Sequence, residues 1–386
     1  MTFASPHLRH SRFLSNLPIL LLLLSLPTAG QASEFYMNAA TGDDRNAGTE
    51  ASPLATAQKA VALASPGDTI HLFPEGAVVR QEISLNGKEG ITIDGHGVTL
   101  TGADPLPADG WETVRPNLAR RRMPQTIMQR HLLIVRGKAN RMGRSPTVNT
   151  PFPLPEQLQP GQFCWQDIDE KQGWLYVCGP REGLEWSVRM SGVRTSGRNR
   201  DITLRNINCR HALNDGFNIH GDCRGLQCAN ITGYDNFDEG FSAHDTCQCW
   251  IAGGRFWGND NAVADVNQAD TFYRNCEFRD SVSTEVLFQG GKHSLDDCRI
   301  VAQGRNAFLA VSTQISRTNP TRVAVECRLT NCRIDSIDAP PRTFLLKDAD
   351  VTITDCQLEQ VRLDITDSRV AVQLSTLDGQ PLTVSK

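Results

Sequence analysis

The sequence predicts an all-β protein in which short parallel strands stack as a solenoid, a parallel β-helix. The phrase NDGFNIHG at 214–221 recurs as DEGFSAHD at 238–245. Similar spacing then continues through the anchor positions Gly216, Gly240, Val263, Glu285 and Ala307. Apolar and polar residues alternate within each repeat, and no helical stretch separates the repeats. A rung of about 22–24 residues cannot bury its inner face alone, so neighbouring rungs must stack in register.

This register predicts which side chains face the core. The first inward column is Phe217, Phe241, Ala264, Val286 and Phe308, and the second is Ile219, Ala243, Val266, Phe288 and Ala310. Side chains alternate across a strand, so the residues between these columns should face outward. The first outward column is then Asn218, Ser242 and Asp265, and the second is His220, His244, Asn267 and Gln289.

Composition narrows the class of protein. The 386-residue chain has a formal net charge of −4, and 21% of its residues are charged. A nucleic-acid-binding protein usually carries a strongly basic domain, so we expect no nucleic-acid partner. We expect a monomer.

The N-terminus has the pattern of a secretory signal. Two arginines, Arg9 and Arg12, precede the short apolar segment Leu17–Pro27, and Ala32 offers a small-residue cleavage site. About eleven apolar residues are too few to span a bilayer. The sequence therefore predicts a signal peptide over 1–32, a secreted or periplasmic protein, and no membrane span after cleavage.

Export would permit disulfides among the 12 cysteines. Cys164 and Cys178 bracket a predicted hairpin and could bond across its strands. Cys223 and Cys247 occupy matching positions of successive repeats, so they should be neighbours at a separation that a disulfide accepts. Cys276 and Cys298 occupy one column and are best explained as core packing.

The N-terminal region of the mature chain supports the solenoid independently. Thr56–Ala64 is an alanine-rich helix that Pro66 and Gly67 stop, and it would cap the open end of the stacked strands. The segment 39–75 with this helix, the first rungs at 91–102 and the later repeats resemble the right-handed parallel β-helix superfamily. That superfamily includes pectate lyases, polygalacturonases and alginate-modifying enzymes. The resemblance implies a right-handed solenoid and a polysaccharide partner. It identifies no subfamily, because the polygalacturonase, pectate lyase and alginate epimerase motifs are not found.

Three regions follow the predicted signal peptide. Residues 33–103 form the N-terminal cap and first rungs, and 191–386 form the main β-helix. A run of prolines breaks the period between them, so 104–190 is predicted to be an inserted β-rich subdomain. Its arginines could bind an acidic sugar, with Arg141 and Arg144 as candidate substrate-binding residues, or they could simply be solvated.

The candidate site lies on the rungs that carry the repeated phrase. Adjacent rungs are about 4.8 Å apart, so His220 and His244 should stack, flanked by acidic residues. The candidate catalytic residues are His220, His244, Glu239, Asp265 and Tyr234. The candidate substrate-binding residues on the solenoid are Asn218, Ser242, Asn267 and Gln289. An alternative is that the acids before each glycine serve only as turn residues.

Several chemistries fit these residues. A lyase acting on a uronate would use a histidine base and a tyrosine acid, with Ca²⁺ held by Asp215, Asp238 and Asp245. A glycoside hydrolase would use an Asp/Glu pair. A zinc site of His220, His244 and Asp265 is disfavoured, because outward neighbours on a flat sheet seldom converge tetrahedrally. A non-catalytic polysaccharide-binding or surface-structural protein stays open. We expect a polysaccharide lyase, with hydrolysis as the nearest alternative.

Overall fold

The computed structural model describes residues 1–2, 32–140, 152–314, 320–337 and 340–384. Ala32–Lys386 form one compact unit. Most of the predicted signal peptide, and both Arg141 and Arg144, lie outside the described residues. No helix in the described part of the chain has the length and apolar character to cross a membrane.

Three sheets run along the solenoid, parallel except for the last strand of sheet 2, and each full rung gives one strand to each sheet. Sheet 1 contains β1 (Glu34–Asn38), β2 (Thr69–Phe73), β5 (Thr92–Asp94), β17 (Thr203–Arg205), β21 (Leu226–Ala229), β24 (Gln248–Ala252), β27 (Asp270–Arg274), β30 (Gly291–Asp296), β35 (Val325–Thr330), β38 (Ala349–Thr354) and β41 (Arg369–Gln373). Sheet 2 contains β3 (Val78–Val79), β6 (Thr99–Thr101), β18 (Asn208–Arg210), β22 (Thr232–Tyr234), β25 (Arg255–Trp257), β28 (Glu277–Arg279), β31 (Arg299–Ala302), β36 (Arg333–Ser336), β39 (Gln357–Glu359), β42 (Thr376–Leu377) and β43 (Gln380–Pro381). Sheet 3 contains β4 (Ile83–Asn86), β15 (Val193–Ser196), β19 (Phe217–Ile219), β23 (Glu239–Ala243), β26 (Asn261–Val266), β29 (Thr284–Gln289), β32 (Asn306–Val311), β37 (Arg342–Lys347) and β40 (Val361–Thr366).

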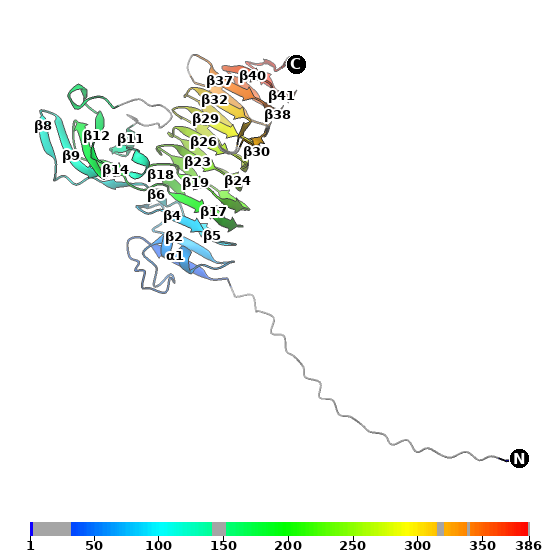
Figure 1. Ribbon diagram of the computed structural model, residues 1–386, viewed down its shortest axis with the longest axis horizontal. Helices are drawn as coiled ribbons and strands as arrows, with labels where there is room; N and C mark the ends of the chain where they lie inside the picture. Colours follow the sequence, from blue (N-terminus) through cyan, green and yellow to red (C-terminus); the bar gives the residue numbers. More distant parts are fainter. Residues whose placement is uncertain (3–31, 141–151, 315–319, 338–339, 385–386) are drawn as a thin grey trace. The chain divides into compact units, whose positions relative to one another are not determined.

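Two short strand pairs lie outside these sheets. Strand β16 (Arg198–Arg200) pairs in parallel with β20 (Asp222–Arg224) between sheets 3 and 1. Strands β33 (Thr313–Gln314) and β34 (Arg322–Val323) pair antiparallel. The rungs climb in sequence order through the solenoid in Figure 1, and the predicted right-handed parallel β-helix is confirmed.

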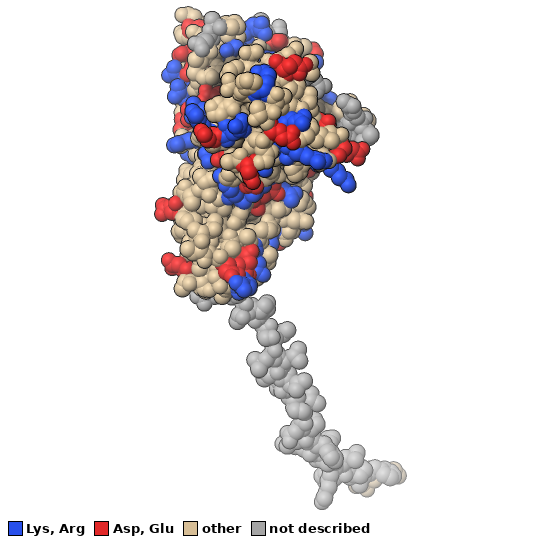
Figure 2. Space-filling model, turned by 90° about the vertical axis from the view of Figure 1, so that its left-hand side faces the viewer, with Lys and Arg blue, Asp and Glu red and all other residues tan. Residues whose placement is uncertain are grey.

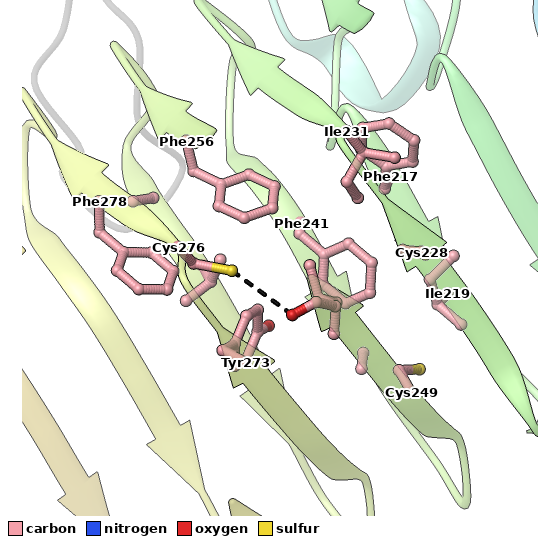
Figure 3. Packing of buried hydrophobic residues seen from close by; sticks show 14 of the residues in the cluster. Phe217, Ile219, Cys228, Ile231, Phe241, Cys249, Phe256, Tyr273, Cys276 and Phe278 are labelled. Atoms are coloured by element: carbon pink, nitrogen blue, oxygen red, sulfur yellow. Dashed lines mark hydrogen bonds between the residues drawn. The ribbon is translucent and has the colours of Figure 1, made fainter. Parts of the chain in front are cut away.

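The core consists of apolar columns that run through successive rungs. Phe217 and Phe241 are in register, with ring centroids 6.2 Å apart, and both are fully buried. In sheet 2, Phe256 stacks on Phe278 with ring centroids 5.8 Å apart (Figure 3). Burying such a side chain contributes about 1.5–3 kcal/mol, so the ladder of aromatic rings is a main source of the rungs' stability.

The predicted register is wrong by a single position on one rung. Phe241 pairs with Val263, and Val263 pairs with Val286, so Ala262 and not Val263 matches the glycine anchors. The rung after Gly240 is thus shorter than the repeat before it. Side chains alternate, so this shift turns Ala264 outward and Asp265 inward.

Helix α1 (Ala57–Leu63) covers the first rungs, as predicted. The hydroxyl of Thr56 accepts a 3.2 Å hydrogen bond from the Lys59 N–H and caps the helix N-terminus. Ala57, Ala60 and Val61 are buried against the core. The helix therefore shields apolar surface at the start of the solenoid.

The insertion between β6 and β15 forms two antiparallel four-stranded sheets, which lie to the left of the solenoid in Figure 1. One contains β7 (Ala103–Pro105), β10 (Leu133–Val135), β11 (Lys138–Asn140) and β14 (Leu184–Ser187). The other contains β8 (Glu112–Arg115), β9 (Leu118–Pro124), β12 (Phe163–Asp169) and β13 (Gln172–Cys178). Two short 3₁₀ turns, η1 (Ile127–Gln129) and η2 (Pro155–Gln157), complete the described part. The insertion has its own buried cluster around Phe163, Trp165 and Trp186.

All twelve cysteines are buried free thiols, so neither expected disulfide forms. In the hairpin Cys164 faces Tyr176, while Cys178 pairs with Leu118 of β9 on the other side. The Cys247 thiol instead donates to the backbone carbonyl oxygens of Ile219 and Gly221. The predicted place of Cys276 and Cys298 in the core is confirmed: both side chains are buried in the main apolar cluster.

Candidate active site

A cluster of carboxyl groups lies at the corner where the chain passes from sheet 2 to sheet 3. The backbone N–H of Glu239 donates a 3.1 Å hydrogen bond to Asp215 Oδ1, and the two carboxyl groups are themselves hydrogen-bonded. Asn214 Nδ2 donates to Asp215 Oδ2 at 2.9 Å, and Asn261 Nδ2 donates to Glu239 Oε1 at 2.8 Å. The two acids on successive rungs are thus one unit, held by an amide on each side.

Glycine makes this corner possible. A Cβ atom on Gly216 would lie 2.8 Å from the Gly240 carbonyl oxygen, and one on Gly240 would lie 2.7 Å from the Ala262 carbonyl oxygen. Below the corner, Asn236 Nδ2 donates to Asn259 Oδ1 at 3.0 Å. The repeated acid–glycine–phenylalanine phrase therefore has a structural cause: the glycine admits the next rung and the phenylalanine enters the core.

Burial determines the protonation of the carboxyl pair. Asp215 is 1% exposed, and burial raises its pKa to about 7. The pKa of Glu239 is raised well above its usual range, first by burial and then by the negative charges of Asp238 and Asp215. Two buried carboxyl groups in contact cannot both ionise at low cost. The pair consequently retains a proton near neutral pH and titrates as a unit.

Arg130 of the insertion reaches this corner. Its Nη2 atom forms a 2.8 Å ion pair with Asp238 Oδ2, and its Nη1 atom donates to Asn214 Oδ1. The guanidinium also lies over the Phe237 ring, 5.2 Å from the centroid. The guanidinium of Arg130 thus pairs with Asp238 directly beside Asp215 and Glu239. The sequence placed Arg130 among the insertion's arginines but did not identify it as a site residue, because only the docking of the insertion brings it here.

The same oxygens could hold a hard cation. One oxygen each of Asp215, Asp238 and Glu239 lie within 4.8 Å of one another, and carboxylate oxygens are the ligands that Ca²⁺ prefers. Asp245, the third predicted Ca²⁺ ligand, is not part of this group. It lies beyond the other end of the strand, where its Oδ2 atom accepts a 2.8 Å hydrogen bond from the Gly221 N–H.

The predicted histidine stack is confirmed, but it lies apart from the carboxyl pair. The rings of His220 and His244 stack with centroids 4.0 Å apart. Ser242 Oγ is 2.7 Å from His244 Nε2, and His220 Nδ1 is 3.5 Å from Asp245 Oδ2. Extended chain of roughly 16 Å separates position 215 from position 220. The expectation that Asp215 and Glu239 flank the histidines is therefore wrong, whereas Asp245 does lie beside His220.

Two predicted site residues do not lie where expected. Asp265 is fully buried inside the solenoid, where its Oδ2 atom accepts 2.7 and 2.8 Å hydrogen bonds from the hydroxyls of Thr271 and Tyr273. Burial raises its pKa to about 7. Asn267 lies in a turn with φ of +66°, and Val266 takes its place beside Gln289. Both errors follow from the single-position shift in register.

The remaining predicted positions stay on the outside of the solenoid. Asn218 and Ser242 are neighbours in register on sheet 3, between the carboxyl pair and the histidine stack, and both are nearly inaccessible to solvent. Among the described residues, Asn218 Oδ1 has no hydrogen-bond partner. Gln289 is half-buried further along the sheet.

Tyr234 belongs to an aromatic ladder on sheet 2. Its ring stacks on Trp257 at 4.8 Å, and the guanidinium of Arg279 lies 4.8 Å from the Trp257 ring centre. Arg210 covers Tyr234 from the other side at 6.0 Å. Arg210 and Arg279 were not predicted as site residues. Arg210 lies one rung before Tyr234 and Arg279 one rung after Trp257, and this spacing in the sequence could have identified them.

Comparisons with known proteins agree on the architecture. The sequence matches no protein-family model and no curated protein. A solved structure described as the complex of XylC with xylose superposes with a TM-score of 0.56 at 13% identity, covering 86% of this chain and 69% of that one. Pectate lyase Pel9A gives 0.53 at 10% identity, covering 92% and 82%, and a glycoside hydrolase gives 0.52 at 11% identity, covering 90% and 97%.

The chain has their right-handed parallel β-helix fold. Identities of this size show the fold alone, so the reaction has to be argued from the site itself.

Proposed function

We propose that the protein is a secreted carbohydrate-active enzyme that hydrolyses a polysaccharide at the carboxyl cluster of Asp215, Asp238 and Glu239. The observation that carries the proposal is the pair Asp215–Glu239, which keeps a proton near neutral pH beside a carboxylate paired with Arg130. Glycosidic cleavage needs this combination of one protonated and one ionised carboxyl group. The fold shared with a pectate lyase and a glycoside hydrolase supports polysaccharides as the first substrates to test.

In the proposed reaction the protonated pair acts as the general acid. It donates its proton to the glycosidic oxygen as the bond from that oxygen to the anomeric carbon breaks. The Asp238 carboxylate attacks the anomeric carbon and forms a glycosyl ester. Water then hydrolyses that ester while the deprotonated pair accepts a proton from it. One oxygen each of Asp215, Asp238 and Glu239 lie within 4.8 Å of one another. This is closer to the separation of about 5–5.5 Å between the carboxyl groups of retaining enzymes than to the wider separation in inverting enzymes, so we expect retention of the anomeric configuration.

The aromatic ladder would supply binding energy next to this site. Tyr234 and Trp257 lie on sheet 2, just before the corner that carries Asp238 and its neighbours. Sugar rings present apolar faces that pack on such aromatic surfaces, and the adjoining guanidinium groups can donate hydrogen bonds to hydroxyl or carboxylate oxygens.

Two arginines of the insertion already bind other groups of the protein. The insertion's positive charge is therefore no reason to restrict the substrate to an acidic polysaccharide. Arg120 forms a 2.8 Å ion pair with Glu112, and Arg121 donates to backbone carbonyl oxygens. On the face of the molecule in Figure 2, basic and acidic side chains are intermingled and do not form separate patches. Neutral glycans therefore belong in the substrate panel.

Elimination on a uronate is the second candidate. The three clustered carboxyl groups favour it, because together with Ca²⁺ they could neutralise a substrate carboxylate. Elimination also needs a base to remove a proton from the sugar, and the candidate histidines lie roughly 16 Å away along the strand, which weighs against it.

A panel of neutral and uronate-containing polysaccharides separates the candidates. Hydrolysis releases reducing ends without new ultraviolet absorbance, whereas elimination also creates an unsaturated, absorbing product. Binding without either signal would indicate a non-catalytic role and overturn the proposal. Glu239→Gln is the matched inactive variant, because glutamine retains the hydrogen bonds to Asn261 and Asp215 but cannot give up a proton.

A further inference from the structure

A second cluster of ligating side chains lies on sheet 1, near the N-terminal end of the solenoid and apart from the carboxyl corner. His71 of β2 and His96, in the turn after β5, approach each other with 2.9 Å between His71 Nδ1 and His96 Nε2. Asp94 of β5 completes the group: one ligand atom from each of the three residues lies within 4.8 Å of the others. We propose that this cluster binds a divalent transition-metal ion of the Zn²⁺ type, with His71 Nδ1 and His96 Nε2 as ligands and Asp94 as the supporting carboxylate.

The hydrogen-bonding state of the two rings points to a metal. Without one, a single N–H must lie between His71 Nδ1 and His96 Nε2. Either ring can supply it. Among the described residues, His71 Nε2 is buried and has no hydrogen-bond partner. His96 Nδ1 is 3.9 Å from Asp94 Oδ1, too far for a hydrogen bond. In the metal-free arrangement the ring that donates the inner N–H has no hydrogen on its outer nitrogen, so a lone pair there faces a carboxylate oxygen 3.8 or 3.9 Å away.

A metal ion bound between the inner nitrogens, His71 Nδ1 and His96 Nε2, changes where the ring hydrogens lie. Both outer nitrogens then carry hydrogens, and each faces a carboxylate: His71 Nε2 lies 3.8 Å from Glu34 Oε1, and His96 Nδ1 lies 3.9 Å from Asp94 Oδ1. Outer-shell carboxylates on ligating histidines are the usual means of orienting them. The cluster supplies one such carboxylate for each ring.

The surroundings fix the ligands in place. Imidazole nitrogens bound tetrahedrally to zinc lie about 3.3 Å apart, so the observed separation needs only a small opening. Tyr36 stacks on His71 at 4.9 Å, and Phe73 stacks on His96 at 4.9 Å. Asp94 Oδ1 accepts from Asn206 Nδ2 at 3.0 Å, and its Oδ2 accepts from Arg205 Nε at 2.8 Å. Apart from that small opening, both rings and the carboxylate are already held in place.

A bound ion would link two successive rungs, because His71 and His96 come from neighbouring turns of the chain. An ion that binds only the folded state stabilises it by mass action. The expected result is saturable binding of one Zn²⁺ by metal-stripped protein, with a rise in melting temperature that depends on the Zn²⁺ concentration. Ca²⁺, which prefers oxygen ligands, should not reproduce either effect.

Calorimetric titration with ZnCl₂, together with thermal unfolding, tests the proposal in four proteins. His96→Gln should abolish the one-site binding, and Asp94→Asn should weaken it by about 10–100-fold, the usual effect of losing a supporting carboxylate. His220→Gln removes a member of the other stacked histidine pair and is the matched control; it should bind as wild type does. His96 is half-buried, so its variant should fold, and circular dichroism without metal confirms this. Equal binding by wild type and His96→Gln, or loss of binding only in His220→Gln, would overturn the assignment.

Discussion

Glu239 occupies the position of Asp215 on the next rung, and its backbone N–H donates a hydrogen bond to Asp215 Oδ1. The regular spacing of the solenoid therefore brings two acids into contact out of water. Burial is the main reason why both pKa values are raised, and for Glu239 the negative charges of Asp238 and Asp215 add to it. Two buried carboxyl groups this close cannot both ionise at low cost, so they share a proton. An arrangement with this electrostatic cost is typical of a functional site.

Removing either acid of the pair should stop catalysis and leave the fold intact. We expect Glu239→Gln and Asp215→Asn each to lower kcat by about 10²–10⁴-fold, the range for loss of a positioned acid or base. Both amides can keep hydrogen bonds to their neighbours, so circular dichroism should match the wild type. Asp355→Asn, at an exposed turn with φ of +53°, is the matched control and should retain full activity. Undiminished turnover by Glu239→Gln would refute the assigned role.

The pH dependence of activity follows from the same pair. The general acid must hold its proton, and burial raises the pKa of Asp215 to about 7 with that of Glu239 also raised. We expect kcat/KM to fall as pH rises through about 7 and beyond, because the pair then loses its proton. A rate profile measured from pH 5 to 9 checks this. A profile that rises across that interval would point to a base with a pKa near neutrality instead.

Arg130 should matter for stability as well as activity. Its side chain and that of Asp238 are mostly buried, so Arg130→Met leaves a carboxylate without its partner. Breaking a buried ion pair in this way costs about 3–5 kcal/mol. The double variant Arg130→Met/Asp238→Asn removes the unpaired charge and should recover part of that loss. Urea unfolding of the two variants measures it. If the single variant is as stable as the wild type, the ion pair does not hold the insertion to the corner.

The repeat sufficed to predict the fold and the histidine stack, because apolar columns recur wherever rungs must stack. It did not suffice for Asp265. A polar residue such as Asp265 is expected to face outward, so its polarity gave no sign that it faces the core. The rung that carries it is shorter than the rung before it, and this shifted the predicted register by one position. The apolar series Phe241, Val263, Val286 and Phe308 would have corrected it.

The role of Arg130 could not be predicted for a different reason. Arg130 and Asp238 are far apart along the chain, and their contact depends on how the insertion packs against the solenoid. Periodicity describes neighbouring rungs only. A contact between an irregular insertion and a rung leaves no pattern in a single sequence.

Asp265 should make stability depend on pH. Its pKa is about 7 in the folded protein, well above that of an unfolded aspartate, so between about pH 4 and pH 7 only the folded state keeps the proton. The free energy of unfolding contributed by this group therefore falls as pH rises to about 7, by up to about 4 kcal/mol at 1.36 kcal/mol per pKa unit. Asp265→Asn resembles the protonated form and should lose this dependence. Urea midpoints at pH 4.5 and 7.5 should differ less in the variant than in the wild type; an equal difference would contradict the buried-proton assignment.

The histidine stack provides the sharpest test between hydrolysis and elimination. Burial, and then the neighbouring His220, lower the pKa of His244 to about 4, so its imidazole is neutral at working pH. It lies roughly 16 Å along the strand from the carboxyl pair, beyond reach of the same bond. For the carboxyl mechanism we expect His244→Gln, which can keep the hydrogen bond to Ser242, to change kcat/KM by less than about threefold. A histidine base would instead make the loss about 10²-fold or more. The comparison uses the substrate found in the panel, with Glu239→Gln measured alongside. If His244→Gln is inactive and folded while Glu239→Gln is active, catalysis belongs to the histidines, and the carboxyl corner is only a turn.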